Sequence, residues 1–283
     1  MKFINNQYKF DGKDNFRIIV LSDIHFSYIF NLDILTEIKN YIIKEKADYI
    51  CMPGDIIDGE YCLNDSNRNT IFLDWFKELG KIAPTIISLG NHDFKCENKK
   101  VIKHNFFFSK LEKINNVHLL DNKEFEDKKV KIVGYTSIID YYDQKINNDE
   151  YIKDIDKTFS FKDKSKYNII LCHSPRNISK KEIVNKLKLM DNADLVLSGH
   201  MHNGMHLPII DKIYKGNIGI ISPRKKPFPN CARGHIKRKK NNNEINFVIS
   251  GGITKLSEKS PKVLHKFNKL YQPHIETIDI IKK

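Results

Sequence analysis

Short apolar runs rich in β-branched residues recur along the 283-residue chain, and several of them end directly before a cluster of polar residues. Runs of this length, bounded by turn-forming residues, are typical of β-strands and are too short to cross a membrane. The chain therefore needs one or more β-sheets as its framework. The regions that we expect to form strands are residues 17–22, 49–52, 85–89, 117–120, 130–135, 167–172, 195–198, 247–250 and 275–280.

Helical periodicity separates several of these runs. We expect helices over residues 33–45, over 71–79, which Gly80 would end, and over 179–190. Strand and helix alternate in the first part of the chain, as parallel βαβ units require, and the later part is richer in strands. We therefore predict a layered α/β fold with two sheets covered by helices, in a single domain spanning residues 1–283.

Five polar clusters each follow one of the predicted strands. Because ligands in α/β sheets bind outside the carboxyl ends of the strands, these clusters are expected to line a single crevice. The five clusters are Ser22-Asp23-Ile24-His25, Gly54-Asp55-Ile56-Ile57-Asp58, Gly90-Asn91-His92-Asp93, His173-Ser174-Pro175 and Gly199-His200-Met201-His202.

Each cluster taken alone has an ordinary structural explanation. Asp23 and His25 could be a helix N-cap and a surface histidine, and the Gly-Asp pair at 54–55 could form a tight turn. Taken together, the clusters offer carboxylates, imidazoles and one amide oxygen, which suit Mn, Fe or Zn rather than calcium. One carboxylate placed between two cations could bridge them. The five cysteines show no Cys-x-x-Cys spacing, which argues against a thiolate zinc site.

The formal net charge of +13 suggests an anionic partner, but most of the basic residues are lysines dispersed along the chain. Specific phosphate recognition depends largely on arginine, so general surface charge explains most of the excess. The exception is the basic segment 224–240, which either helps to hold an anionic substrate or forms a solvated hairpin loop. The first residues show no apolar core of a signal peptide, and we expect a cytoplasmic protein.

The order of the polar clusters resembles that of the calcineurin-like metallophosphoesterase superfamily. Asp-x-His, Gly-Asp-x-x-Asp, Gly-Asn-His-Asp, a lone His and Gly-His-x-His all occur here, in sequence, and the resemblance spans about residues 16–280. The stretch after the last cluster is similar to that of small bacterial single-domain members. The resemblance implies a four-layer αββα sandwich, with two mixed β-sheets flanked by helices and metals at the carboxyl ends of the strands.

The resemblance also implies a set of metal ligands for two divalent cations. Asp55 would bridge the two cations. The side chains that would hold the first metal are Asp23, His25 and His202. The side chains that would hold the second metal are Asn91, His173 and His200.

The reaction implied by the resemblance is hydrolysis of a phosphomonoester or phosphodiester by a bridging hydroxide, with Mn favoured over Fe or Zn. His92 would assist the leaving group, and Asp58 would hydrogen-bond His92 and fix its tautomer. Gly59 follows Asp58 where phosphoprotein phosphatases carry an arginine that clamps phosphate. A phosphoprotein substrate is therefore not expected.

The substrate that we expect is a small molecule or a lipid headgroup. A nuclease of the same superfamily, acting on DNA or RNA, is the alternative, which dispersed lysines and the lack of an added DNA-binding domain disfavour. A scaffold that had lost its activity would lack a ligand, and none is missing. Peripheral contact with anionic membranes is compatible with catalysis. The sequence does not determine the oligomeric state.

Overall fold

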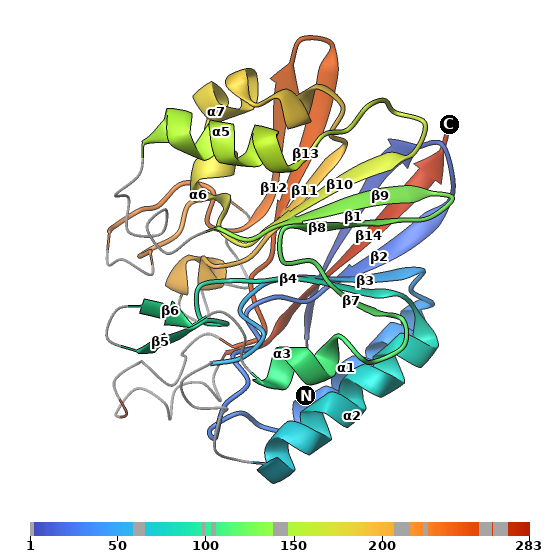
Figure 1. Cartoon of the computed structure of the whole chain (residues 1–283), viewed down its shortest axis with the longest axis vertical. Coiled ribbons are helices and arrows are strands. Elements are labelled where there is room, and N and C mark those ends of the chain that lie inside the picture. Colours follow the sequence, from blue (N-terminus) through green and yellow to red (C-terminus); the bar gives the residue numbers. More distant parts are fainter. Residues whose placement is uncertain are drawn as a thin grey trace.

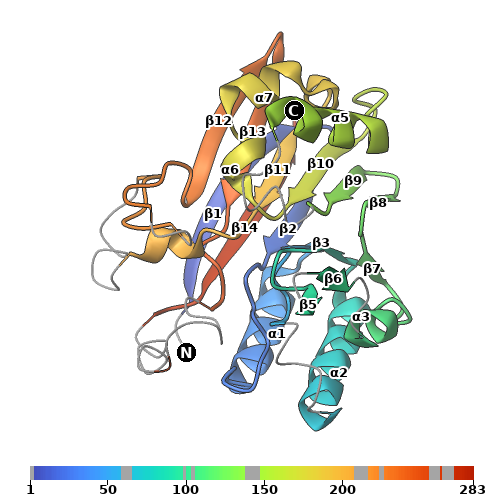
Figure 2. The same cartoon turned by 60° about the vertical axis from the view of Figure 1, so that its left-hand side comes forward.

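The computed structural model describes residues 3–58, 66–97, 100–102, 106–137, 147–206, 216–222, 226–254, 262 and 271–283. Two six-stranded sheets pack face to face, and helices cover the outer face of each sheet (Figures 1 and 2). The predicted αββα layering is confirmed.

The first sheet is mixed, with the strand order β1-β14-β2-β3-β4-β7. Strands β2, β3, β4 and β7 are parallel, whereas β14 is antiparallel to β2 and pairs in parallel with the edge strand β1. The carboxyl ends of β2, β3 and β4 therefore lie along one edge. The bounds are β1 Ile4–Gly12, β2 Phe16–Val20, β3 Tyr49–Pro53, β4 Thr85–Ser88, β7 Val117–Leu119 and β14 His274–Lys282.

The second sheet is also mixed, with the order β12-β13-β11-β10-β9-β8. Its four central strands are parallel, and an antiparallel strand closes each side. The bounds are β8 Lys123–Glu126, β9 Val130–Tyr135, β10 Tyr167–Cys172, β11 Leu195–Ser198, β12 Gly234–Lys240 and β13 Asn243–Ile249. A separate two-stranded ribbon consists of β5 Lys95–Glu97 and β6 Lys100–Ile102.

The helices divide between the two sheets (Figure 1). Those that cover the first sheet are α1 Asp33–Glu45, α2 Ser66–Ile82 and α3 Phe106–Leu111. Those that cover the second sheet are α5 Asn148–Thr158, α6 Pro175–Ile178 and α7 Lys181–Lys186, with the 3₁₀ turn η1 Lys188–Asp191. A second 3₁₀ turn, η2 His202–Met205, follows β11. Of the described helices, none is both long and apolar enough to cross a bilayer.

Side chains of β2 alternate between two apolar cores, which explains why the strand is apolar from Ile18 to Val20. Ile18 and Val20 belong to the core between the two sheets, while Ile19 and the following Leu21 belong to the core beneath α1, α2 and α3. Residues 169–172 of β10 repeat this pattern in the second sheet. Because successive side chains of a strand point to opposite faces, a sheet between two layers must be apolar on both.

The prediction that Gly80 ends the second helix is wrong, because α2 continues to Ile82. A Cβ atom at position 80 would lie 2.5 Å from the backbone oxygen of Asn115. Asn116 also donates a hydrogen bond from Nδ2 to the Gly80 oxygen at 2.8 Å. Glycine at position 80 therefore allows the backbone at Asn115 to pack closely against α2, and it does not cap the helix.

The predicted continuous helix over 179–190 is also wrong. Leu187 has φ −70° and ψ 113°, which ends α7 at Lys186 and separates it from η1. The carboxylate of Asp156, on α5, accepts hydrogen bonds from the backbone N–H groups of Lys188 at 3.2 Å and Leu189 at 3.3 Å. A side chain from a neighbouring helix thus replaces the helical hydrogen bonds that the break removes.

Each of the nine predicted strand regions overlaps an observed strand, but β1, β5, β6, β8 and β12 were not predicted. Residues of β1 alternate between exposed and partly buried, which leaves no apolar run to detect. The described part of the basic segment 224–240 includes β12, which pairs with β13 as a hairpin strand rather than a solvated loop. Arg224 and Lys225 lie outside the described residues.

Candidate metal centre

The loops that follow β2, β3, β4, β10 and β11 meet at one edge of the two sheets. Their side chains form three groups in which the potential ligand atoms lie within 4.8 Å of one another. Asp55 belongs to two of these groups. The first ligand group is Asp23, His25, Asp55 and His202; the second ligand group is Asp55, His173 and His200; the third group is His25, Asp58 and His92.

In the first ligand group the imidazoles face the carboxylates through Nε2. His25 Nε2 lies 3.6 Å from Asp55 Oδ2 and 4.0 Å from Asp23 Oδ1. His202 Nε2 lies 3.7 Å from Asp23 Oδ1. His25 Nε2 is buried and has no hydrogen-bond partner among the described residues. A buried ring nitrogen that faces carboxylates beyond hydrogen-bond distance fits a shared cation.

In the second ligand group Asp55 is again the common carboxylate. His173 Nε2 lies 2.9 Å from Asp55 Oδ2, and the ring centroids of His173 and His200 are 5.1 Å apart. The backbone N–H of His92 donates to Asp55 Oδ1 at 2.8 Å, which brings the preceding Asn91 close to this group. Asn91 Oδ1 is buried and, within the part of the chain that the structure describes, has no hydrogen-bond partner. An amide oxygen of this kind fits a cation ligand.

Two histidines are oriented by backbone carbonyl groups. His173 Nδ1 donates to the oxygen of Pro53 at 2.7 Å, and His202 Nδ1 donates to the oxygen of Thr254 at 2.9 Å. Because a carbonyl oxygen only accepts, each Nδ1 carries the proton. Nε2 of each ring therefore faces the carboxylates and is the nitrogen that a metal could bind.

Asp58 lies between two histidines. Its Oδ1 accepts from His25 Nδ1 at 3.0 Å and from His92 Nδ1 at 2.7 Å. Burial alone would raise the pKa of Asp58, but His25 and His92 hold it well below its usual range. The predicted contact with His92 is present, and the contact with His25 was not predicted. Gly59 lies outside the described residues.

Asp93 has a structural role that the sequence analysis missed. Its Oδ2 accepts from the backbone N–H groups of Asp55 at 2.8 Å and Gly90 at 2.7 Å, and its Oδ1 accepts from those of Ile56 and Ile57 at 2.8 and 2.9 Å. Four N–H donors make this buried carboxylate a clamp between the loops after β3 and β4. The sequence feature that could have pointed to this role is its position in the Gly-Asn-His-Asp cluster.

Five of the seven predicted metal ligands have a left-handed backbone. The φ angles are 51° at Asp23, 49° at His25, 54° at Asp55, 69° at His200 and 45° at His202. For non-glycine residues such sparsely populated conformations cost about 1–3 kcal/mol each and concentrate at functional sites. The loops therefore give up stability in order to direct these side chains toward one place.

The glycines of the clusters allow carboxylates to pass close to the backbone. A Cβ atom on Gly90 would lie 2.3 Å from Asp55 Oδ1, and one on Gly199 would lie 2.4 Å from Asp23 Oδ2. A side chain at either position would displace a carboxylate of the ligand groups.

The buried carboxylates dominate the electrostatics of the centre. Burial alone would lower the pKa of His25, but Asp58, Asp55 and Asp23 raise it to about 9. Burial would likewise lower the pKa of His173, and chiefly Asp55 raises it to about 9. So much buried negative charge requires positive partners. Carboxylate, amide and imidazole donors together fit divalent cations such as Mn, Fe or Zn.

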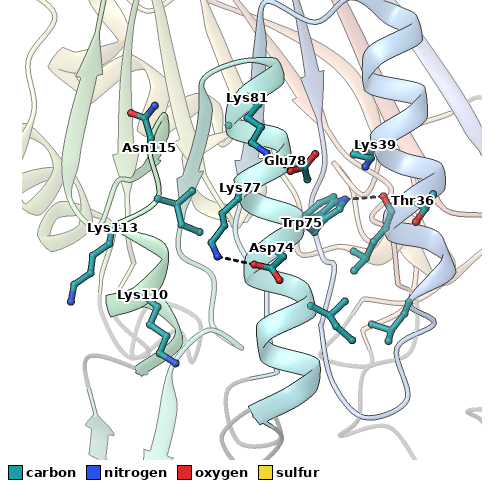
Figure 3. Close-up of a pocket in the computed structure, with 15 residues that line it drawn as sticks. Thr36, Lys39, Asp74, Trp75, Lys77, Glu78, Lys81, Lys110, Lys113 and Asn115 are labelled. Carbon is teal, nitrogen blue, oxygen red and sulfur yellow. Dashed lines mark hydrogen bonds and ion pairs between the residues drawn. The ribbon is translucent and has the colours of Figure 1, made fainter.

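A groove of about 900 Å³ lies among α1, α2 and α3, away from the metal centre, and none of the predicted site residues lines it (Figure 3). Its charged side chains largely pair with one another: Lys77 with Asp74 at 2.7 Å and Lys81 with Glu78 at 2.5 Å. These pairs are surface contacts between residues one turn apart on α2. The size of the groove therefore does not identify it as a reaction site.

Several known proteins are similar to this chain. An uncharacterized metallophosphoesterase of Helicobacter pylori is 27% identical over 192 residues, which cover 68% of this chain and 46% of that protein. The phosphodiesterase YaeI of Escherichia coli is 34% identical over 84 residues, which cover 29% of this chain and 30% of that protein. The chain thus spans less than half the length of the Helicobacter pylori relative.

Among solved structures, a dimetal phosphatase of Danio rerio aligns with 84% of this chain and 88% of its own, at 12% sequence identity and a TM-score of 0.45. The model of the calcineurin-like phosphoesterase family matches residues 16–204, which is more than half of the chain and includes all five polar clusters. The resemblance found in the sequence is thereby confirmed: the chain belongs to the calcineurin-like phosphoesterase family.

Proposed function

We propose that this chain is a metal-dependent phosphoesterase that hydrolyses a phosphomonoester or a phosphodiester with two divalent cations. The observation that carries the proposal is the position of Asp55, which is shared by the first and the second ligand group. A carboxylate in this position can contact two cations at once and balance part of the charge of each. That is the arrangement that two-metal phosphoryl chemistry requires.

In this proposal each ligand group holds one cation, and Asp55 contributes to both. When bound, the cations would supply charge stabilisation to the phosphoryl oxygens and lower the pKa of the attacking water. The donor set suits Mn, Fe or Zn, and we favour Mn. The proposed ligands of the first cation are Asp23, His25 and His202. The proposed ligands of the second cation are Asn91, His173 and His200.

In this proposal His92 donates a proton to the leaving oxygen of the substrate. Its Nδ1 is held by Asp58, so Nε2 is the ring nitrogen that can meet a substrate. The His92 side chain is 17% exposed, whereas those of His25 and His173 are fully buried. The His202 side chain is 11% exposed, so partial exposure permits contact between His92 and a substrate but does not by itself distinguish His92 from the proposed cation ligands. Asp58 accepts the Nδ1 proton of His92 and orients the ring, so that the proton given to the leaving oxygen would come from Nε2.

The substrate that we propose is a small phosphoester. The comparisons do not support the nuclease alternative, since the relatives are named metallophosphoesterase and phosphodiesterase. The cytoplasmic location and the peripheral membrane contact stay predictions.

The test begins with metal-stripped protein, to which Mn²⁺, Fe²⁺ or Zn²⁺ is returned. Hydrolysis of nitrophenyl phosphate, bis(nitrophenyl) phosphate, a cyclic nucleotide and single-stranded DNA is then measured, together with metal content by mass spectrometry. We expect two metals per chain and turnover of at least one of the small esters. Protein that binds two metals and hydrolyses no ester would contradict the proposal.

A further inference from the structure

A smaller pocket adjoins the metal centre. It has a volume of about 390 Å³, and its wall includes His200, a member of the second ligand group. The rest of the wall comes from the α6–α7 region, from residues 226–231 with Ser222, and from β12. The pocket therefore opens beside the place where a phosphoryl group would meet the proposed cations.

The wall of this pocket is cationic. Arg176, Lys180, Lys226 and Arg238 line it, and none of the described residues that line it is Asp or Glu. The neighbouring ligand groups, by contrast, are rich in carboxylates. Several positive side chains around one concave surface, without a carboxylate among them, create a potential that attracts anions.

Arg238 is held in a defined orientation within this wall. Its Nε donates to the backbone oxygen of Ser179 at 2.9 Å, and its Nη1 donates to that of Lys237 at 3.1 Å. Its Nη2 also lies 3.9 Å from Cys231 Sγ. A guanidinium fixed in this way loses little conformational freedom when it binds an anion, which favours affinity.

Arg176 connects the pocket with the metal centre through a short stretch of chain. It lies three residues after the proposed ligand His173, at the start of α6, and is partly buried. Lys180 and Lys226 are exposed, so water screens their charges more strongly. The two arginines should therefore contribute most to the binding of an anion.

We infer that this pocket binds a second phosphoryl group of the substrate while the metal centre binds the one that is hydrolysed. The inference rests on the proposed function. Arginine matches phosphate through paired hydrogen bonds, and a phosphate monoester carries a charge of about −1.5 to −2 near neutral pH. That charge suits a four-cation wall better than the single charge of a carboxylate.

The size of the pocket narrows the substrate class. Its volume of about 390 Å³ lies near the lower end of the range of small-molecule sites, about 300–1,000 Å³. It can therefore hold one phosphoryl group and a short spacer rather than a stretch of polymer. The substrate class that follows is a small molecule with two phosphoryl groups.

Binding of three matched ligands to the full chain would test this inference by isothermal titration calorimetry, with Mn²⁺-loaded and with metal-stripped protein. The ligands are propyl phosphate, 2-carboxyethyl phosphate and propane-1,3-diol bisphosphate. Charge-assisted hydrogen bonds to the second phosphoryl group should make the bisphosphate bind about 10- to 100-fold more tightly than propyl phosphate. The carboxylate ligand should fall between the two.

The variants are Arg238→Gln and, as a second one, Arg176→Gln, each checked for folding by thermal melting. Each should reduce the bisphosphate preference about 10-fold, because one charge-assisted contact is lost. Lys239→Gln is the matched control, since Lys239 is exposed on the same strand and does not line the pocket. It should leave the preference unchanged.

Three results would overturn the inference: equal binding of bisphosphate and propyl phosphate, equal binding of the carboxylate ligand and the bisphosphate, or an unchanged preference in both arginine variants. The proposed function fails separately. If the bisphosphate binds in an Arg238-dependent manner but no ester is hydrolysed, the pocket assignment stands and the phosphoesterase proposal is wrong.

Discussion

The two halves of the metal centre use different chemistry. Loops of the first sheet supply all the carboxylates, the amide and one imidazole ligand, His25, whereas loops of the second sheet supply only imidazoles: His173, His200 and His202. The carboxylate half is tied together internally, because Asp93 accepts backbone N–H groups from two of its loops. In the imidazole half, the backbone N–H of Gly199 donates to the oxygen of His173 at 2.9 Å, and carbonyl groups orient His173 and His202 through Nδ1.

The halves also hold each other. The carbonyl of Pro53, at the end of β3, orients His173 of the second sheet. The carboxylate of Asp23, after β2, accepts the backbone N–H of His200 at 3.0 Å. A substitution in the carboxylate half should therefore weaken the binding of both cations and lower the stability of the fold. A substitution in the imidazole half should affect mainly the cation that the substituted residue binds.

The largest effect is expected for Asp55→Asn. Removal of the shared charge should prevent the binding of both cations. Activity should fall by more than the ~100-fold that is lost when a residue hydrogen-bonded to a metal ligand is removed. His202→Ala, in the imidazole half, should cost mainly one cation. Metal content per chain measures the difference, with the exposed Asp74→Asn as the control. Equal metal loss in both site variants would contradict the distinction between the halves.

His92→Ala should lower kcat about 10²- to 10⁴-fold, because general acid assistance is lost. Metal content should stay at two per chain, since His92 is assigned to substrate and not to a cation. The loss should be larger for an alkyl ester than for a nitrophenyl ester, whose leaving group needs less protonation. A uniform loss for both esters would argue against proton transfer by His92.

Asp93→Ala should lower the free energy of unfolding by about 3–5 kcal/mol, because it leaves four buried N–H groups without their acceptor. Urea denaturation of metal-stripped protein measures this without contribution from bound cations. Metal affinity should fall as well, since the loops after β3 and β4 lose their clamp. Unchanged stability would show that Asp93 does not hold the carboxylate half together.

Asp156→Ala is a comparison variant in the helical layer of the second sheet, outside the ligand groups, and a smaller effect is expected. Asp156 also accepts two backbone N–H groups, but at 3.2 and 3.3 Å and near the surface. Loss of such a cap should cost about 1 kcal/mol. The same urea experiment applies, and metal content should be unchanged. A cost as large as that of Asp93→Ala would show that burial and the number of N–H donors do not set the size of the effect.

Much of this fold was predictable because its physical causes are local. Residues 130–135, 167–172 and 195–198 are mostly apolar, as expected for strands between two layers, and their predicted bounds match β9, β10 and β11. The strand β1 was missed because an edge strand with one solvent-facing side needs no apolar run. Gly80 was misjudged because its role depends on Asn115, which is far along the chain.

The candidate site shows the same division. Convergence of the clusters was predictable, since the carboxyl ends of parallel strands share an edge. The role of Asp93 was not, because its acceptor function involves backbone groups 36 to 38 residues earlier, and their positions depend on how two loops cross.

By itself, the sequence determined the layer pattern and the donor chemistry of the centre, because strand periodicity and ligand type are properties of individual residues and their neighbours. Only the tertiary structure decided which positively charged side chains lie close together. Arg176, Lys226 and Arg238 come from separate parts of the chain, and charge has no periodicity that would reveal their common pocket. Their proximity exists only because α6, β12 and the segment between them pack beside the metal centre.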